Sequence, residues 1–209
     1  MGTLYLVRHG QASFGAADYD NLSPLGTRQS IRLGEYFAGK GLHFDAVLTG
    51  TLRRHQQTYA GICQGAGTSM EALPWPGLNE YDSQALIEAI HPEPLAKPDT
   101  PELYRHHFRL LRDALQAWMA GRTQPRGMTS YTDFVGGIEA ALDHVRQNHA
   151  GDVMVVSSGG PISTAVGRVL GTPAETTIEL NLLIRMHAPV HCPALASHGT
   201  NLRRASMRL

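Results

Sequence analysis

Three residues with the chemistry of an anion site follow one another near the start of the chain. A short apolar run, Leu4 to Val7, ends in Arg8, His9 and Gly10. Arginine offers a fixed fork of donors that fits phosphate, glycine lets a ligand approach the backbone, and histidine can act as a nucleophile. Taken alone, the triplet is more typical of a surface turn, so the rest of the sequence has to decide between the two interpretations.

A second arginine-bearing segment lies at residues 51–58, directly after another apolar run at 45–48. Arg53 and Arg54 stand where a helix is expected to begin. A phosphoryl group beside them would meet both a guanidinium fork and the free N–H groups of a helix start. A basic helix start that faces water is the alternative interpretation.

The elements that must position these residues follow from the apolar periodicity. Strand patterns lie at residues 4–7, 45–48, 68–73 and 153–156, and helix patterns lie at 24–39, 101–119, 131–149 and 161–171, with a further helix opening near Arg54. Strand, helix and strand units of this length are parallel crossover units. We therefore predict an α/β fold, a three-layer αβα sandwich with a mostly parallel sheet. Its strands at 3–7, 45–48 and 153–156 should point their carboxyl ends at one crevice.

Composition narrows the function further. The chain has 209 residues, of which 42% are hydrophobic and 17% charged, and this suits a single domain over 1–209. Lys plus Arg equals Asp plus Glu at 18 each, so no global field favours nucleic acid or an anionic membrane, and any phosphate site must be local. Cys63 and Cys192 make no disulfide framework. No signal-peptide pattern opens the chain, and no apolar stretch approaches the ~20 residues of a membrane span. We expect a cytoplasmic protein.

The motifs around both arginine segments resemble the histidine phosphatase superfamily, the phosphoglycerate-mutase-like proteins. The opening signature of that family corresponds to Arg8-His9-Gly10-Gln11, followed by Leu22-Ser23-Pro24-Leu25-Gly26 and Gln29. Its second motif, Pro-Leu-x-Arg-Ala-x-Gln-Thr, corresponds to residues 51–58, with Arg54 on the motif arginine. Here His55 stands on the motif alanine, and Gly50 stands on the serine that precedes the proline.

Two further motifs follow in the family's order. Residues 77–82 resemble its Leu-x-Glu segment, whose glutamate corresponds to Glu80, with Asp82 as a spare carboxylate. Residues 157–160 resemble its Ser-His-Gly-Gly motif, in which the histidine lies on the phosphoryl oxygens. Ser158 stands at the position of that second histidine.

The resemblance implies a role for each matched residue. His9 would attack phosphorus, and Glu80 would protonate the leaving oxygen. The phosphate-binding set would be Arg8, Arg54, Ser158 and Gly159, and the candidate substrate-binding residues are Gln11 and Ser23. No metal or other cofactor is expected, because the arginines supply the positive charge that Mg²⁺ supplies in other phosphoryl-transfer sites.

The predicted function is a metal-independent phosphatase that hydrolyses a small phosphomonoester through a phosphohistidine on His9. Its activity should be reduced, because Ser158 offers a neutral donor in place of a charged one, and Ser158→His should raise kcat with little effect on stability. If His9 is not the nucleophile, His55 is the next candidate. The alternatives are a phospho-ligand-binding or regulatory protein without turnover, and an interaction module with a vestigial pocket. A phosphoglycerate mutase is less favoured, because Gly15 replaces the asparagine of mutase-type members and the chain has no length for their longer insertion.

The remaining stretches are less regular. Prolines mark an extended loop within residues 83–130, and the resemblance implies that this stretch is a helical insertion that covers the phosphate pocket and sets substrate preference. Residues 179–184 resemble the last strand of the family, and residues 185–209 have no period and are expected to be irregular. The sequence does not decide the oligomeric state, and a homodimer is one of the alternatives.

Overall fold

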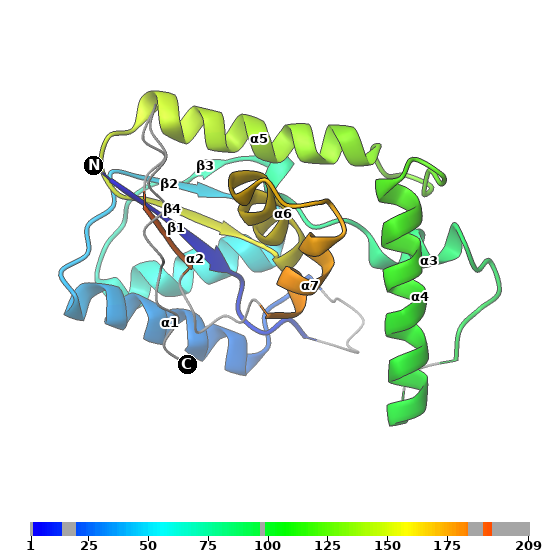
Figure 1. Cartoon of the computed structure of the whole chain (residues 1–209). Coiled ribbons are helices and arrows are strands. Elements are labelled where there is room, and N and C mark those ends of the chain that lie inside the picture. Colours follow the sequence, from blue (N-terminus) through cyan, green and yellow to red (C-terminus); the bar gives the residue numbers. More distant parts are fainter. Residues whose placement is uncertain (1, 14–19, 97–98, 184–189, 194–209) are drawn as a thin grey trace.

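The sheet at the centre of the protein has its strands in the order β3-β2-β4-β1-β5 (Figure 1). This computed structural model describes residues 2–13, 20–96, 99–183 and 190–193. The strands are β1 (Thr3–Arg8), β2 (Ala46–Thr49), β3 (Leu73–Pro74), β4 (Val153–Ser157) and β5 (Val190–Pro193). The first four run parallel, and β5 pairs antiparallel with β1. The predicted mostly parallel sheet is confirmed.

Helices cover both faces of the sheet, which gives the predicted three layers (Figure 1). One face carries α1 (Pro24–Gly39) and α2 (Arg53–Ala66), and the other carries α5 (Tyr131–Asn148) and α6 (Gly159–Leu170). Helix α7 (Thr176–Leu183) packs beside α6. A short 3-10 helix, η1 (Pro76–Leu78), follows β3 and lies against α5.

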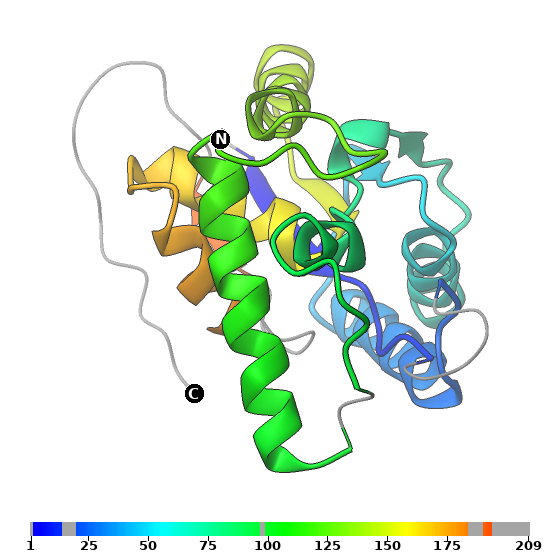
Figure 2. The ribbon, with the colours of Figure 1, turned by 90° about the vertical axis from the view of Figure 1, so that its right-hand side faces the viewer.

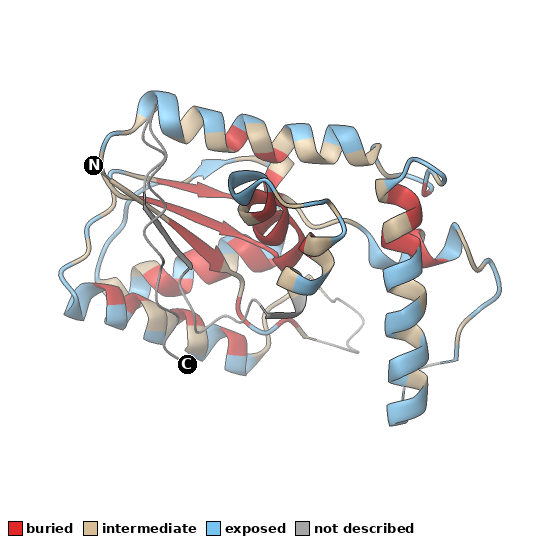
Figure 3. Cartoon of the chain, in the orientation of Figure 1, coloured by how far each residue is buried: buried red, intermediate tan, exposed pale blue. Residues whose placement is uncertain are grey.

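The alternation of side chains along each strand assigns them to one face or the other. Leu6 and Val155 belong to the buried cluster under α5 and α6. Val7 and Val156 belong to the cluster under α1 and α2. Figure 3 shows the central strands buried, as expected of a parallel sheet between two helix layers. The same alternation continues past the strand ends and decides where the site residues point.

The helix boundaries follow local signals. Ser23 caps α1 by accepting the Gly26 N–H, and Pro24 takes the first helical position, as the sequence predicts. Helix α6 begins at Gly159, two residues before the predicted start, because Ser158 already has the extended conformation of an N-cap residue. The helix ends at Leu170 and is capped by Gly171, whose φ of 65° lies in the left-handed region that glycine favours.

Two helices stand beyond the carboxyl ends of the strands, α3 (Ser83–Glu88) and α4 (Pro101–Met119). Figure 2 looks at that end of the molecule and places α4, in green, in front of the sheet. Leu86 of α3 and Trp118 of α4 share a buried cluster to which Phe134 of α5 also packs. The helix at 101–119 is confirmed, and α3 is a further short helix that the sequence does not predict, ahead of the loop marked by the prolines. The extent of the insertion, 83–130, stays a prediction.

Two of the strand predictions are wrong. Residues 179–184 resemble a strand, but α7 covers them as far as Leu183. A short apolar run does not distinguish a buried strand from a buried helix, and leucine is a strong helix former. The strand expected at 68–73 is reduced to Leu73–Pro74, where Pro74 fits because β3 is at an edge of the sheet.

The tail was expected to be irregular, yet it contains β5 at residues 190–193. Residues 184–189 and 194–209 lie outside the described part of the chain. Within the described part, no helix is long and apolar enough to cross a membrane.

Candidate active site

The candidate site lies where β1 and β4 end side by side. Arg8 and Ser157 are partners in the parallel register, and the His9 N–H donates to the Ser157 carbonyl oxygen at 2.9 Å. His9 and Ser158 are the next pair along, and the strand alternation turns both toward the face of α1 and α2. Arg8 turns toward α6, where its Cζ lies 3.4 Å from the place that a Cβ on Gly159 would occupy.

His9 is held in the tautomer that a nucleophile needs. Its Nδ1 lies 2.7 Å from the Gly10 carbonyl oxygen, which only accepts, so Nδ1 carries the proton and Nε2 keeps its lone pair. Thr58 fixes Gly10 in turn, because its Oγ1 accepts the Gly10 N–H at 3.0 Å. The pKa of His9 is lowered to about 4, first by burial and then by the charges of Arg54 and Arg8, while the bond to Gly10 opposes the shift. The ring is therefore neutral at neutral pH.

Arg54 lies buried in the first turn of α2 and binds a carboxylate of the protein itself. Its Nη1 donates to Asp20 Oδ1 at 2.7 Å. The Arg53 N–H donates to the other oxygen of Asp20 at 2.9 Å. Asp20 thus engages both the guanidinium and the helix start that the sequence assigns to a phosphoryl group. A phosphate that enters here has to displace Asp20 or share Arg54 with it.

Glu80 presents a buried carboxyl group to the same site. Its Oε2 accepts the Gly160 N–H at 3.1 Å, and its Oε1 is buried with no hydrogen-bond partner in the described structure. Burial raises the pKa of Glu80, against the opposing effects of the Gly160 N–H and of Arg54 and Arg8. Glycine at residue 160 leaves room for this carboxyl group, because a Cβ there would lie 2.1 Å from Glu80 Oε1 and would push the side chain aside. The arrangement favours a protonated carboxyl, which is able to donate its proton.

The space beside Ser158 is already occupied, although the sequence predicts that Ser158→His has little effect on stability. The Ser158 side chain is fully buried, and its Oγ lies 2.7 Å from Nε2 of His55. The His55 ring comes from the first turn of α2, and its centroid is 5.7 Å from that of His9. Burial, followed by His9 and Arg54, lowers the pKa of His55 to about 2, so this ring is neutral. The site therefore contains an imidazole to which the family motif gives no role.

The two candidate substrate-binding residues bind each other. Ser23 Oγ donates to Gln11 Oε1 at 2.8 Å, and the Gln11 N–H donates to Gln29 Oε1 at 3.0 Å. These bonds shape the loop that follows His9, and the substrate-binding role of Gln11 and Ser23 stays a prediction. Asp82, the spare carboxylate, accepts the first free N–H groups of α3 and serves as its cap.

Asn181 lies beside Gly159 and Tyr81. Its Nδ2 donates to the Tyr81 hydroxyl at 3.2 Å, and a Cβ on Gly159 would lie 2.0 Å from its Oδ1. Asn181 lies within the stretch that the sequence predicts as a strand, and the structure carries it on α7. Gly15, on which the argument against a mutase depends, lies outside the described residues.

A cleft of about 750 Å³ opens beside Arg8 on the side of α4. Its lining surface is mostly apolar and includes Phe108, together with Tyr81, Asn181 and the arginines Arg105, Arg109 and Arg112. Arg105 and Arg112 form ion pairs with carboxylates. The cleft has the size, the charge and the position to take the organic part of a phosphorylated ligand.

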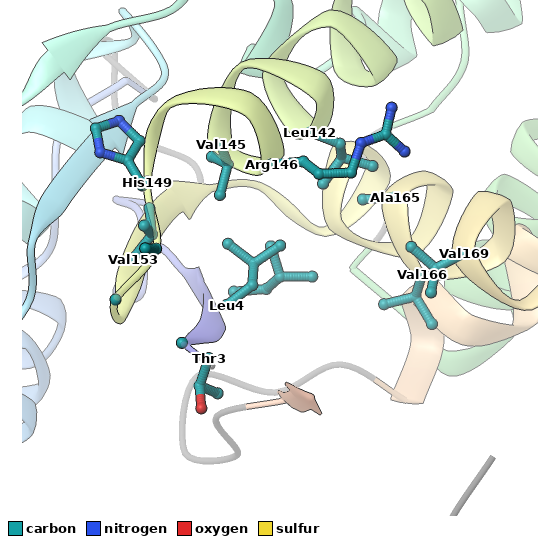
Figure 4. A pocket seen from close by; sticks show the side chains of 14 residues that line it. Thr3, Leu4, Leu142, Val145, Arg146, His149, Val153, Ala165, Val166 and Val169 are labelled. Carbon is teal, nitrogen blue, oxygen red and sulfur yellow. The ribbon is translucent and has the colours of Figure 1, made fainter. Parts of the chain in front are cut away.

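A second cavity, of about 120 Å³, lies at the other end of the sheet (Figure 4). Leu4 and Val153, near the amino ends of β1 and β4, line it together with Val145 of α5 and Val166 of α6. Because His9 and Ser158 follow the carboxyl ends of the same strands, this apolar cavity is separate from the candidate site.

Sequence reasoning misses Asp20 and the contact that His55 makes. The signal for His55 is its place directly after the motif arginine, in the first turn of a helix that points at the site. Asp20 offers no comparable signal, because an aspartate in a polar loop is ordinary. Within the described residues, no group of three or more His, Cys, Asp or Glu side chains could hold a metal ion.

The fold is thus an αβα sandwich in which Arg8, His9 and Arg54 gather at the carboxyl edge of a mostly parallel sheet. A family model of the histidine phosphatase superfamily (branch 1) matches residues 4–188, and the chain belongs to this superfamily. The assignment confirms the family that the motifs indicate, and it supports a phosphatase in general terms.

Curated relatives match shorter segments. The chain is 33% identical over 63 residues to a broad-specificity phosphatase of Saccharomyces cerevisiae, which is 27% of each chain. It is 36% identical over 89 residues to a 2,3-bisphosphoglycerate-dependent phosphoglycerate mutase of Rhizobium meliloti, which is 39% of this chain and 42% of the relative. The match thus spans less than half the length of either relative.

Solved structures match over most of the chain. A mycobacterial glucosyl-3-phosphoglycerate phosphatase superposes with a TM-score of 0.60 at 19% identity, covering 86% of this chain and 84% of that one. The alpha-ribazole phosphatase of Shigella flexneri superposes with a TM-score of 0.57 at 20% identity, covering 85% and 84%. At these identities the likeness shows a shared fold.

Proposed function

We propose that the protein is a phosphatase that hydrolyses phosphomonoesters through a phosphohistidine on His9, without a metal ion. The state of His9 carries the proposal. Its Nδ1 proton is bound to the Gly10 carbonyl, and its pKa is lowered to about 4, so Nε2 offers a lone pair beside Arg8 and Arg54. A neutral imidazole among cations is the form that attacks phosphorus.

In the first half of the reaction, Nε2 of His9 attacks phosphorus in line with the ester oxygen. A P–N bond forms and the ester P–O bond breaks. Arg8 and Arg54 stabilise the charge on the equatorial oxygens. Glu80 gives its proton to the leaving oxygen, which departs as an alcohol.

In the second half, the Glu80 carboxylate takes a proton from a water molecule, and the water oxygen attacks phosphorus. The P–N bond breaks and its electron pair returns to Nε2 of His9. Inorganic phosphate leaves, and both residues are back in their starting protonation states.

The cleft beside Arg8 supports a preference among substrates. It is bounded by three arginines of α4, and Arg109 has no ion-pair partner in the described structure. Substrates whose alcohol part carries further negative charge are therefore favoured. This preference is part of the proposal, and the similarity to a broad-specificity phosphatase over 63 residues is compatible with it.

A phosphate-binding or regulatory protein without turnover is the second candidate. One observation favours it, namely that Asp20 already engages Arg54 and the start of α2. A mutase is a weaker candidate, because Gly15 stands where mutase-type members carry an asparagine.

Release of phosphate from an aryl phosphate separates these functions. We expect turnover by the wild type and none by His9→Ala, with an alkali-stable, acid-labile phosphoprotein trapped on His9. The control is His144→Ala, because His144 lies on α5 away from the site. Turnover by His9→Ala above a few per cent would place the nucleophile elsewhere. No turnover by the wild type, together with protection from heat by inorganic phosphate, would favour the binding protein.

A further inference from the structure

His55 is a buried imidazole that the reaction above does not use. Its side chain is 0% exposed, its Nε2 lies 2.7 Å from Ser158 Oγ, and its ring centroid lies 5.7 Å from that of His9. Burying a polar ring costs free energy unless its nitrogens find partners. A ring placed at this cost against the reacting histidine is expected to have a function in the site.

The hydrogen-bond pattern around His55 fixes the direction of its bond to Ser158. Nδ1 of His55 is buried and has no hydrogen-bond partner in the described structure. A proton on Nδ1 would be an orphaned buried N–H, which native proteins rarely contain. With the proton on Nε2, that nitrogen donates to Ser158 Oγ, and Nδ1 keeps only a lone pair. The hydroxyl proton of Ser158 is then uncommitted, since its Oγ has no other hydrogen bond in the described part of the chain.

We propose that His55 is a positioning residue, which holds Ser158 Oγ so that the Ser158 hydroxyl proton points at a phosphoryl oxygen of the substrate. The inference rests on the proposed phosphatase function. Ser158 follows β4 on the same face as His9, beside the place where Nε2 of His9 meets phosphorus. Ser158 is fully buried in the free protein, so the transferred group reaches its hydroxyl only after a local rearrangement at this edge of the sheet, and an oxygen of that group is then the acceptor that the hydroxyl lacks.

The same contact accounts for three departures from the family motifs. Gly50, His55 and Ser158 meet in one place, because a Cβ on residue 50 would lie 2.1 Å from His55 Nδ1 and Ser158 Oγ touches the other ring nitrogen. His55 is larger than the motif alanine, whereas Gly50 and Ser158 are smaller than the motif serine and histidine. The imidazole therefore reaches this part of the site from α2 instead of from the turn after β4.

Two substitutions at His55 separate its hydrogen bond from its volume. His55→Leu keeps most of the volume and removes the donor, whereas His55→Gln keeps an N–H donor close to the place of Nε2. With an aryl phosphate we expect kcat to fall about 10- to 100-fold in His55→Leu, by analogy with the loss of groups that orient metal ligands. Most of this loss should be absent in His55→Gln, and KM should change little. Ser30→Ala is the control, because it removes an equally buried hydroxyl whose bond stays within α1.

A double variant tests whether His55 acts through Ser158. Ser158→Ala should lower kcat by an amount similar to His55→Leu, and the combination should be no slower than Ser158→Ala alone, because both remove the same oriented hydroxyl. If His55→Leu does not fold, Gly50→Ala takes its place, since its methyl group would displace the ring at Nδ1. An unchanged kcat in the folded variants, multiplied losses in the double variant, or a phosphoserine trapped at Ser158 would each overturn the proposal.

The outcome stays distinct from the fate of the phosphatase function. If the wild type shows no turnover, that function fails, and the thermal shift caused by inorganic phosphate becomes the readout in the same variants. A smaller shift in His55→Leu and Ser158→Ala than in the wild type and Ser30→Ala supports the orienting role. An equal shift in all four, or no shift in the wild type, overturns it.

Discussion

The substitution Ser158→His would place an imidazole where the ring of His55 already lies. Ser158 is fully buried, and its Oγ is 2.7 Å from His55 Nε2, so the new ring has to overlap the old one or push it aside. Overpacking a buried site costs about 1–3 kcal/mol. Each kcal/mol lowers Tm by about 2–4 °C in a chain of this size. The structure therefore predicts a less stable and slower variant, although the motif alone predicts a faster one.

Removing the His55 ring first should reverse that penalty. His55→Ala alone leaves a cavity, and the loss of a large buried side chain costs about 2–5 kcal/mol. In the double variant the imidazole introduced at position 158 fills the space that His55 leaves. We expect the double variant to be more stable than the sum of the single effects by about 0.5–3 kcal/mol, the usual size of coupling between touching residues.

Urea unfolding of the four proteins in this cycle measures the coupling, provided that the slope of free energy against urea is constant among them. The control pairs Ser158→His with Ser30→Ala, whose hydroxyl donates to the Gly26 carbonyl within α1. Those two effects should add within about 0.3–0.5 kcal/mol. If the His55→Ala and Ser158→His effects also add, the two side chains do not share one space, and the packing argument is wrong.

Three further predictions concern charge. Asp20→Asn keeps an acceptor for the Arg53 N–H but removes the negative charge beside Arg54, so inorganic phosphate should inhibit turnover at a several-fold lower concentration than in the wild type. Inhibition at the same concentration in both proteins would mean that Asp20 does not compete with phosphate. The value of kcat/KM should rise with pH through the His9 pKa of about 4, and it should fall at higher pH as Glu80, whose pKa is raised, loses its proton. Glu80→Gln should remove this fall at higher pH, and it should slow the hydrolysis of alkyl phosphates more than that of aryl phosphates. The folded-state pKa values of His9 and His55 lie below the ordinary value of 6.5, so only the unfolded chain takes up these protons as pH falls, and stability should decrease from pH 6.5 toward pH 4. Urea unfolding at several pH values should show a flatter decrease in His55→Gln, and an unchanged slope would contradict a neutral, buried His55.

The strands could be predicted where apolar pattern and turn residues agree. Val153 to Val156 are apolar without a break and end in glycines, and the structure buries them on both faces. Residues 179–183 also resemble a strand in the sequence, yet they form a helix, because packing beside α6 and against the buried cluster of α4 decides between two states that periodicity does not separate. The length of β3 could not be predicted either, because β3 lies at an edge of the sheet and its extent depends on pairing with β2.

The site divides in the same way. Arg8, His9 and Arg54 could be found because their motifs combine residue type with a local position at a strand end or helix start. The contact between His55 and Ser158 joins residues 103 apart in the sequence, and no local pattern reports it. The pairing of Arg54 with Asp20 is also long-range, and only the folded loop reveals which carboxylate meets the guanidinium.

The alternation at the end of β1 also separates two tasks in space. His9 faces the layer of α1 and α2, and Arg8 faces the layer of α6 and lines the cleft bounded by α4. In the proposed reaction, the oxygen that leaves in line from His9 departs toward this cleft. In that reaction the new bond to phosphorus forms at His9, on the side of α1 and α2, whatever alcohol is attached to the phosphoryl group. In the proposed reaction, selection of that alcohol falls to the side chains that line the cleft, most of which belong to α4. A change of substrate then calls for substitutions among the side chains that line the cleft, while the reacting histidine and its supports stay constant.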